Sequence, residues 1–254
     1  MKSAAALTII TGANRGLGYA LAYQLASEGG ALITLSRKQA PGLADHAKKN
    51  GTTLTDILVD LGNADALEQA AKQMLTAITD SANPSSCRLI HNAGIVAPID
   101  PADQLTDLQS IRTAFDVNIA APIYLTGHFL AATKTCADRR ILLISSGAGR
   151  HAYGSWGVYC ATKAAMDRYA EVVHAEGHAN TRVCSLAPGV IDTGMQAQIR
   201  QTPESKLPAV GRFEDMHRQG MLADADQTAK TTLKLLASDS FGHIILDDVR
   251  DHAQ

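Results

Sequence analysis

The chain is short of several features that mark other classes of protein. Its 254 residues include four cysteines, and none of them forms a C-x-x-C pair or another zinc-ligand spacing. No apolar stretch reaches the roughly 18 residues that a membrane-spanning helix needs, and the first residues lack the long apolar run of a signal peptide. We therefore expect a reduced, soluble, cytoplasmic protein whose thiols are small core side chains: Cys87, Cys136, Cys160 and Cys184.

The sequence also lacks an excess of charge of either sign. Lys and Arg number 23 and Asp and Glu number 25, which gives a formal net charge of -2. Binding to nucleic acid or to an anionic membrane usually needs a basic surface, so neither partner is expected. The short pair Arg139-Arg140 is expected to flank a strand and to be solvated. The nine histidines show no H-E-x-x-H or similar ligand spacing, so no metal site is expected.

Apolar material is plentiful, at 46% of the residues, and short apolar runs alternate with longer stretches of helical periodicity. The expected strands are 5–10, 31–35, 53–59, 88–90, 141–144, 182–186 and 243–246, and the expected helices are 15–27, 64–78, 106–135, 158–175 and 227–237. Strands without polar alternation are covered on both faces, so the pattern predicts an α/β protein with a doubly wound parallel sheet, formed by residues 1–254 as a single domain. The stretch 194–220 is expected to be irregular and to cover the substrate.

A glycine-rich turn follows the first expected strand and opens the first helix. It reads Thr11-Gly12-Ala13-Asn14-Arg15-Gly16-Leu17-Gly18, with the spacing G-x-x-x-G-x-G. Glycines let the backbone approach a pyrophosphate closely, and a helix N-terminus offers free N–H groups. A purely structural turn is the alternative, but the position between strand and helix favours a dinucleotide site.

The end of the second strand lacks the acidic residue that binds the ribose 2′-OH in most NAD sites. Instead, Ser36 is followed by Arg37 and Lys38, and Arg15 lies in the glycine turn. A guanidinium suits a 2′-phosphate, which predicts NADP(H) as the cofactor. The alternative is that Arg37 and Lys38 are ordinary solvated charges.

A set of polar residues with catalytic spacing lies in the second half of the chain. Of the six tyrosines, Tyr159 alone has Lys four residues later, at Lys163, which places both on one face of a helix. Ser146 follows the strand 141–144 and precedes Tyr159 by thirteen residues. Asn118 lies in the helical stretch before that strand. Ser145 is an alternative to Ser146, although the spacing favours Ser146.

Together these features resemble the short-chain dehydrogenase/reductase family over nearly the whole chain. The resemblance also includes Asp60, the turn His91-Asn92-Ala93-Gly94 and the pair Pro188-Gly189, with His91 standing where the family most often has Asn. It implies a Rossmann-type fold and the catalytic residues Asn118, Ser146, Tyr159 and Lys163. The cofactor residues that it implies are Gly12, Asn14, Arg15, Gly16, Leu17, Gly18, Ser36, Arg37, Asp60, Leu61, Asn92, Ala93, Gly94, Tyr159, Lys163, Pro188, Gly189, Val190 and Thr193.

The same resemblance implies a role for each catalytic group. Tyr159 would protonate a carbonyl oxygen as hydride arrives from the nicotinamide, with Lys163 lowering its pKa from the ordinary value of about 10. Ser146 would orient the carbonyl, and Asn118 would hold a water for reprotonation. His151 would suit a serine hydrolase, but the sequence lacks the G-x-S-x-G elbow. A non-catalytic, cofactor-sensing protein is the alternative of another class; retention of the whole catalytic set favours the enzyme.

The segment Asp192-Thr193-Gly194-Met195-Gln196 after Pro188-Gly189 is similar to the branch that contains benzil and sepiapterin reductases. This implies an NADPH-dependent carbonyl reductase, with an α-diketone such as benzil as the best-supported substrate; a sepiapterin-type or broad aldehyde/ketone reductase is the alternative. The expected substrate residues are Ser146, Ala148, Tyr153, Trp156 and Met195. Trp156 is otherwise a packing anchor, and Asp247 or Asp248 either contacts substrate or is solvated. A homodimer or homotetramer is expected from the apolar helices 106–135 and 158–175.

Overall fold

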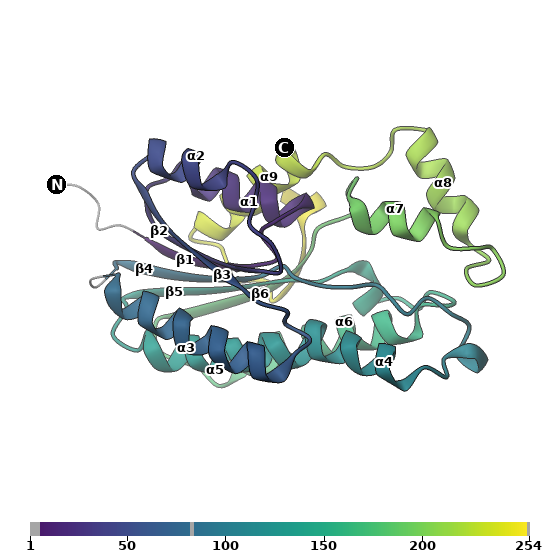
Figure 1. The fold of residues 1–254 in the computed structure, drawn as a ribbon, viewed down its shortest axis with the longest axis horizontal. Helices are drawn as coiled ribbons and strands as arrows, with labels where there is room; N and C mark the ends of the chain where they lie inside the picture. The colour runs from purple at the N-terminus through teal and green to yellow at the C-terminus, as the bar shows by residue number, and fades with distance from the viewer. Residues whose placement is uncertain (1–5, 82–83, 253–254) are drawn as a thin grey trace.

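The computed structural model describes residues 6–81 and 84–252, and a seven-stranded sheet forms its centre (Figure 1). The strands are β1 (Leu7–Thr11), β2 (Gly30–Ser36), β3 (Thr52–Leu58), β4 (Ser86–His91), β5 (Asp138–Ile144), β6 (Thr181–Ala187) and β7 (Leu246–Asp248). They lie in the order β3-β2-β1-β4-β5-β6-β7, and every neighbouring pair is parallel. The predicted doubly wound parallel sheet is confirmed. Its order reverses between β1 and β4, where ligands of such sheets bind.

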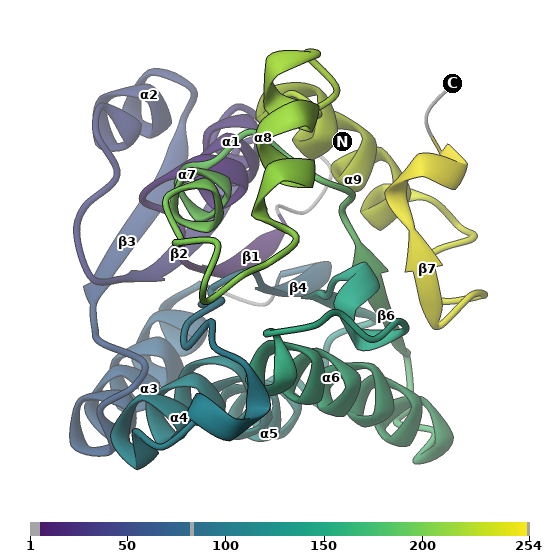
Figure 2. The ribbon, with the colours of Figure 1, turned by 90° about the vertical axis from the view of Figure 1, so that its right-hand side faces the viewer.

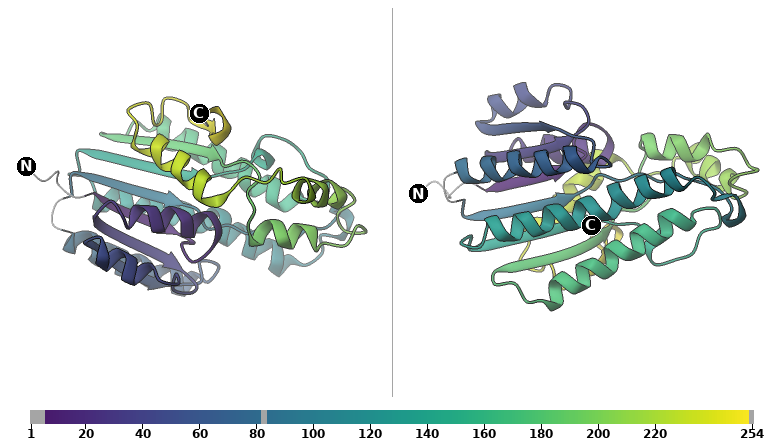
Figure 3. Two further views of the ribbon diagram at one scale, coloured as in Figure 1. Left: turned by 90° about the horizontal axis from the view of Figure 1, so that it is seen from above. Right: turned by 60° about the horizontal axis from the view of Figure 1, so that its bottom comes forward.

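Helices cover both faces of the sheet (Figure 2). One face carries α1 (Gly16–Leu25), α2 (Leu43–Lys49) and α9 (Ala225–Ala237), and the other carries α3 (Ala64–Asp80), α4 (Leu108–Phe115), α5 (Ala121–Ala132) and α6 (Gly157–Ala175). The short helices α7 (Gly194–Arg200) and α8 (Val210–Arg218) project beyond the end of the sheet (Figure 3). Three 3₁₀ turns complete the fold: η1 (Ala102–Gln104), η3 (Gly147–Gly149) and η4 (Val249–His252).

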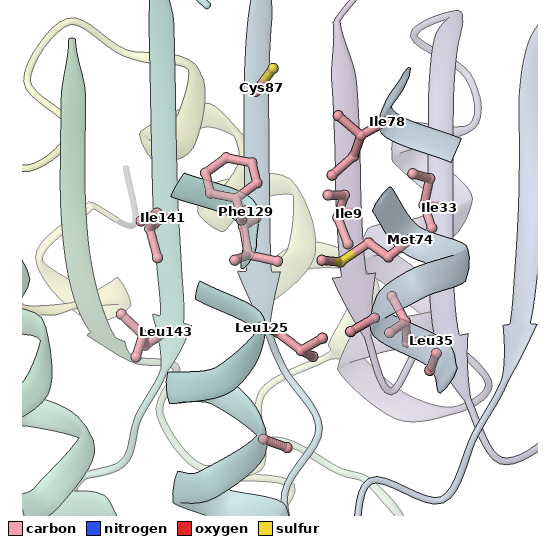
Figure 4. Packing of buried hydrophobic residues seen from close by; sticks show 14 of the residues in the cluster. Ile9, Ile33, Leu35, Met74, Ile78, Cys87, Leu125, Phe129, Ile141 and Leu143 are labelled. Atoms are coloured by element: carbon pink, nitrogen blue, oxygen red, sulfur yellow. The ribbon is translucent and has the colours of Figure 1, made fainter. Parts of the chain in front are cut away.

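Two apolar layers, one on each side of the sheet, form the core. On the α3–α5 side, Met74 of α3 and Phe129 of α5 pack against Ile9 and Ile33 of the strands (Figure 4). All four side chains are at most 1% exposed. Burying each such side chain stabilises the fold by roughly 1.5–3 kcal/mol. Because both faces are covered, every residue of β1 is buried, which explains why the strand contains no charged residue.

The expected helix 106–135 is divided by a π-helical turn, η2 (Asp116–Ala120), which separates α4 from α5. Pro122 lies in the first turn of α5, where its missing N–H costs little. The expected helix is therefore interrupted just before Pro122, at the π-helical turn. Such turns are often found at functional sites, and this one contains Asn118.

Two expectations about the elements were wrong, and one helix was missed. The stretch 194–220 is largely helical, because α7 and α8 form despite the prolines between them. The helix α2 was missed because it is short. Its buried face consists of two residues, Leu43 and Ala47, which is too few to give a clear helical pattern in the sequence. The last strand begins at Leu246 instead of spanning 243–246.

The arginine pair of β5 is buried, contrary to the expectation of a solvated flank. Arg139 is 4% exposed and Arg140 is 8% exposed. The Arg139 guanidinium donates to the carbonyl oxygens of Leu130 and Ala179, and that of Arg140 donates to Asp138 and to Ser238. Their partners are mostly backbone oxygens at the ends of distant elements, so the local sequence gives no sign of them.

The cysteines are free thiols, and Cys87, Cys136 and Cys184 are buried as expected for small core residues, whereas Cys160 is half-buried. Among residues 6–81 and 84–252, no helix is long and apolar enough to cross a membrane. The same residues contain no group of three or more His, Cys, Asp or Glu side chains arranged to hold a metal ion.

Candidate active site

The glycine turn after β1 is shaped by two close approaches that only glycine permits. Gly12 and Gly16 have φ values of +72° and +56°, in the left-handed region. A Cβ on Gly12 would lie 2.9 Å from the Cα of Ala93, and a Cβ on Gly18 would overlap the carbonyl oxygen of Gly12. The turn is therefore packed directly against the loop that follows β4.

The first turn of α1 is open to a ligand. Its N-cap residue, Arg15, makes no side-chain capping bond and is exposed, so the first backbone N–H groups have no side-chain acceptor. Helix N-termini in this state attract phosphate groups. Asn14 is half-buried beside it, and Leu17 is buried in the core. This cradle of glycines and free donors fits the pyrophosphate of a dinucleotide.

The loops after β1 and β4 are joined by Thr11, which opens the glycine turn but was not among the expected cofactor residues. The Thr11 hydroxyl accepts from the backbone N–H groups of Asn92 and Ala93, each at 3.1 Å. In return, Nδ2 of Asn92 donates to the carbonyl oxygens of Thr11 and Gly12. These bonds fix the floor on which a dinucleotide would lie.

The end of β2 carries no acidic side chain. The Ser36 hydroxyl is buried and accepts a 2.8 Å hydrogen bond from the N–H of Ala13, while Arg37 is exposed. Farther along the same edge, Asp60 is exposed and accepts from the N–H of Gly62, and Leu61 is buried. The exposed guanidinium of Arg37 is therefore free to contact a ligand at this strand end.

Tyr159, Lys163 and Ser146 meet where β5 ends and α6 begins. Both α6 side chains are buried, and Nζ of Lys163 lies 5.8 Å from the centre of the Tyr159 ring. Ser146 hydrogen-bonds to Tyr159, and its hydroxyl also accepts from the N–H of Ala148. Ser145, the alternative, is 3% exposed, and its hydroxyl lacks a hydrogen-bond partner among the residues described.

Burial decides the protonation of both α6 groups. It raises the pKa of Tyr159 to about 12, although the hydrogen bond from Ser146 acts in the opposite direction. Burial also lowers the pKa of Lys163 to about 8, and the carboxylate of Asp167 partly offsets this. At neutral pH the phenol therefore holds its proton and the amine is mostly charged, which is the state a proton donor requires.

Asn118 ties three elements together from the π-helical turn. Its Oδ1 accepts from the N–H of Ile95, and its Nδ2 donates to the carbonyl oxygen of Ile95 and to the hydroxyl of Thr162. A Cβ on Gly94 would lie 3.4 Å from Oδ1 of Asn118 and 3.6 Å from Nζ of Lys163. Asn118 and Lys163 thus border the same glycine of the β4 loop.

An aromatic cluster stands beside Tyr159. The Trp156 ring meets Tyr159 edge-on at 5.6 Å, stacks on Phe213 of α8 at 5.3 Å and contacts Tyr153. Ala148, Met195 and residues of α7 and α8 belong to the same apolar cluster. Four of the expected substrate residues, Ala148, Tyr153, Trp156 and Met195, therefore gather here, and α8 contributes Phe213. Phe213 belongs to the stretch 194–220 that was expected to cover the substrate, although it was not named individually.

The turn after β6 reaches back toward the glycine turn. Pro188 is buried, and Gly189 and Val190 are half-buried. A Cβ on Gly16 would lie 3.2 Å from Cγ2 of Thr193, so the start of α7 borders the first turn of α1. The predicted cofactor residues after β1, β2, β4 and β6 thus line the carboxyl edge of the sheet.

Comparison with known proteins agrees with this architecture. Residues 6–204 match the family model described as short chain dehydrogenase. The chain belongs to the short-chain dehydrogenases. A benzil reductase from Bacillus cereus that forms (S)-benzoin is 36% identical over 246 residues, which cover 94% of this chain and 98% of that protein. Sepiapterin reductase from Rattus norvegicus is 31% identical over 248 residues, with 93% of each chain covered.

Among solved structures, a short-chain dehydrogenase/reductase from Burkholderia vietnamiensis is 31% identical, with a TM-score of 0.68 and with 98% of this chain and 99% of that chain covered. The family membership and the suspected branch are therefore confirmed. The chain is an oxidoreductase of the short-chain dehydrogenase type.

Sequence reasoning missed two charged residues of this short-chain dehydrogenase beside the catalytic set. Arg150 follows the η3 turn, and Asp167 lies one turn beyond Lys163 on α6. The helical spacing from Lys163 to Asp167 was a usable signal for the second. Asp247 is also buried, paired with His252 at 2.9 Å, whereas Asp248 pairs with Arg250.

Proposed function

We propose that the protein is an NADPH-dependent carbonyl reductase that reduces an α-diketone such as benzil to a hydroxy ketone. The observation that carries the proposal is the protonated Tyr159, hydrogen-bonded to Ser146 and adjoined by the buried amine of Lys163. The similarity to the Bacillus cereus benzil reductase supports the diketone as substrate.

Each catalytic residue has a distinct task in this proposal. Ser146 donates a hydrogen bond to the substrate carbonyl oxygen, and Tyr159 transfers its proton to that oxygen as the C–H bond forms. Lys163 stabilises the phenolate that results. Asn118, which borders Gly94 together with Lys163, holds a water through which the proton is returned.

The cofactor is assigned to the carboxyl edge of the sheet. When bound, the reduced nicotinamide supplies the hydride. The glycine turn and the open start of α1 accept the pyrophosphate, Arg15 and Arg37 bind the 2′-phosphate, and Asp60 with Leu61 contacts the adenine. Lys163 binds the nicotinamide ribose, and the turn Pro188–Thr193 packs against the nicotinamide.

The aromatic cluster supports a flat, conjugated substrate. Trp156 meets Tyr159 edge-on and itself contacts Tyr153 and Phe213, and aromatic side chains of this kind pack well on aryl rings. The helices α7 and α8 cover the bound substrate in this proposal. The sepiapterin-type alternative is supported by the rat enzyme's similarity.

A substrate panel tests the proposal. Purified protein is assayed with NADPH and with NADH against benzil, other α-diketones, sepiapterin and simple ketones. We expect the highest kcat/KM with benzil and NADPH, and a hydroxy ketone as product. A preference for sepiapterin would favour the alternative. Tight NADPH binding with no oxidation of NADPH by any carbonyl would indicate a cofactor-sensing protein.

We also propose that the chain forms a homodimer or homotetramer through α4, α5 and α6. Phe115, Ile123, Tyr124 and Val172 are exposed apolar side chains on these helices. Exposed apolar side chains of this size commonly mark an interface. Light scattering at micromolar concentration should give a multiple of 26.8 kDa, and a mass of one chain would contradict the assembly.

A further inference from the structure

A buried carboxylate lies one helical turn beyond Lys163. Asp167 is 4% exposed, and its Oδ1 accepts a 2.6 Å hydrogen bond from the hydroxyl of Ser185 in β6. Its Oδ2 lies 3.5 Å from Nε of Arg150. A buried charge is costly unless it is compensated, and the guanidinium of Arg150 supplies the opposite charge here.

Arg150 connects the loop of Ser146 to the sheet. It directly follows the η3 turn (Gly147–Gly149), which begins after Ser146. Its Nη2 donates to the carbonyl oxygens of Ser185 and Asp247, at 3.1 and 2.9 Å. One guanidinium therefore holds the Ser146 loop against β6 and β7, and its Nε faces Asp167 of α6.

The Ser146 loop also rests directly on the catalytic helix. A Cβ on Gly149 would lie 2.7 Å from Oδ2 of Asp167 and 2.9 Å from the carbonyl oxygen of Lys163. No side chain separates the loop from the helix at this point. The distance between Ser146 and the α6 pair is thus set where Arg150 and Asp167 meet.

We propose that Asp167 and Arg150 are positioning residues, which together hold the Ser146 loop against α6 while the Asp167 carboxylate supplies negative charge beside Lys163. The consequence for catalysis rests on the proposed reductase function. The effect of Asp167 on the charge of Lys163 does not depend on that function, because it is a property of the cofactor-free protein.

Asp167 and Arg150 carry opposite charges, so we expect them to shift the pKa of Lys163 in opposite directions. Burial lowers the pKa of Lys163 to about 8, and Asp167 raises it. Tyr159 faces Lys163 on the same helix. Cys184 of β6 lies within the field of Asp247, Arg150 and Asp167, and Asp247 is paired with His252. Removing the negative charge of Asp167 should lower the pKa of Lys163, and removing the positive charge of Arg150 should raise it.

The test is the pKa of Lys163 in the cofactor-free protein, measured by NMR on chains labelled with ¹⁵N at lysine Nζ. In Asp167→Asn, which keeps the shape of the side chain, we expect the pKa to fall to roughly 7, the change that an opposite charge nearby usually gives. In Arg150→Gln we expect it to rise above that of the wild type. The alkaline limb of the pH profile of kcat/KM for benzil reduction should move to lower pH in Asp167→Asn and to higher pH in Arg150→Gln.

Two variants separate this role from general loss of structure. Asp138→Asn removes another carboxylate that is hydrogen-bonded to arginines, at the opposite end of β5, and should leave the pKa of Lys163 unchanged. His252→Gln removes the histidine that is paired with Asp247, beside the contact with Arg150. Melting temperatures identify variants that are simply unstable. If Asp167→Asn does not fold, the direction in which Arg150→Gln shifts the pKa of Lys163 is the test.

The proposal is overturned if the pKa of Lys163 stays the same in the folded Asp167 variant, or if both variants move it in the same direction. If the pKa moves as expected but the wild-type protein reduces no carbonyl with NADPH, the proposed function fails while the electrostatic coupling stands.

Discussion

Nζ of Lys163 donates a 2.8 Å hydrogen bond to the carbonyl oxygen of Ile144. The ammonium group of α6 is thereby fixed to the last residue of β5, two positions before Ser146. Groups from a helix and from a strand thus converge on one point of the sheet edge.

Lys163→Ala removes both this anchor and the charge beside Tyr159. We expect turnover to fall at least 100-fold, within the range that proton-transfer catalysis usually contributes. Because Lys163 is assigned to the nicotinamide ribose, NADPH affinity should fall as well. Steady-state kinetics and fluorescence titration with NADPH measure the two effects. Lys230→Ala, on the exposed side of α9, is the control and should change neither.

Gly18→Ala tests the close packing of the glycine turn. A Cβ there would overlap the Gly12 carbonyl oxygen and Nδ2 of Asn92, so we expect a loss of about 1–3 kcal/mol of stability and weaker cofactor binding. Gly127→Ala in α5 is the matched control, because no atom lies within 4 Å of its Cβ position. It should stabilise the helix by about 0.5–1 kcal/mol. Equal denaturation midpoints for the two variants would refute the packing argument.

Local sequence patterns predicted those parts of the site whose partners lie nearby along the chain. The positions of Gly18 and of the pair Tyr159 and Lys163 follow from a turn motif and from helical spacing. Arg139 was misplaced because its partners are backbone carbonyl oxygens of Leu130 and Ala179, and no residue type marks a free carbonyl. The helical spacing placed Asp167 near Lys163, but its contacts with Arg150 and Ser185 could not be predicted, since only the fold brings these residues to it.

Arg37→Ala tests the preference for NADPH. Arg37 is exposed at a strand end without an acidic neighbour, where a 2′-phosphate would lie. We expect KM for NADPH to rise about tenfold, the effect of losing a charge-assisted hydrogen bond worth about 1.5 kcal/mol. KM for NADH should hardly change. Equal increases in KM for both cofactors would show that Arg37 does not bind the 2′-phosphate.

His91→Asn tests the acid stability of the core. Burial lowers the pKa of His91 to about 3, so the folded protein keeps this ring neutral while the unfolded chain takes up a proton below pH about 6.5. The free energy of unfolding therefore falls as the pH drops through that window. Between pH 7 and 4.5 the wild type should lose about 2–3 kcal/mol more than His91→Asn. Urea titrations at both pH values measure the difference, and parallel losses would contradict the assignment.

Tyr159→Phe tests the central claim, that the phenol of Tyr159 is the proton donor of a carbonyl reductase. The substitution removes one hydroxyl, so the melting temperature and NADPH affinity should stay close to those of the wild type. Tyr169→Phe, the same change on the same helix, is the control and should keep its activity. With benzil and saturating NADPH, we expect Tyr159→Phe to lose at least 100-fold in kcat. Retention of more than about a tenth of the wild-type kcat, under conditions where hydride transfer limits the rate, would contradict the account.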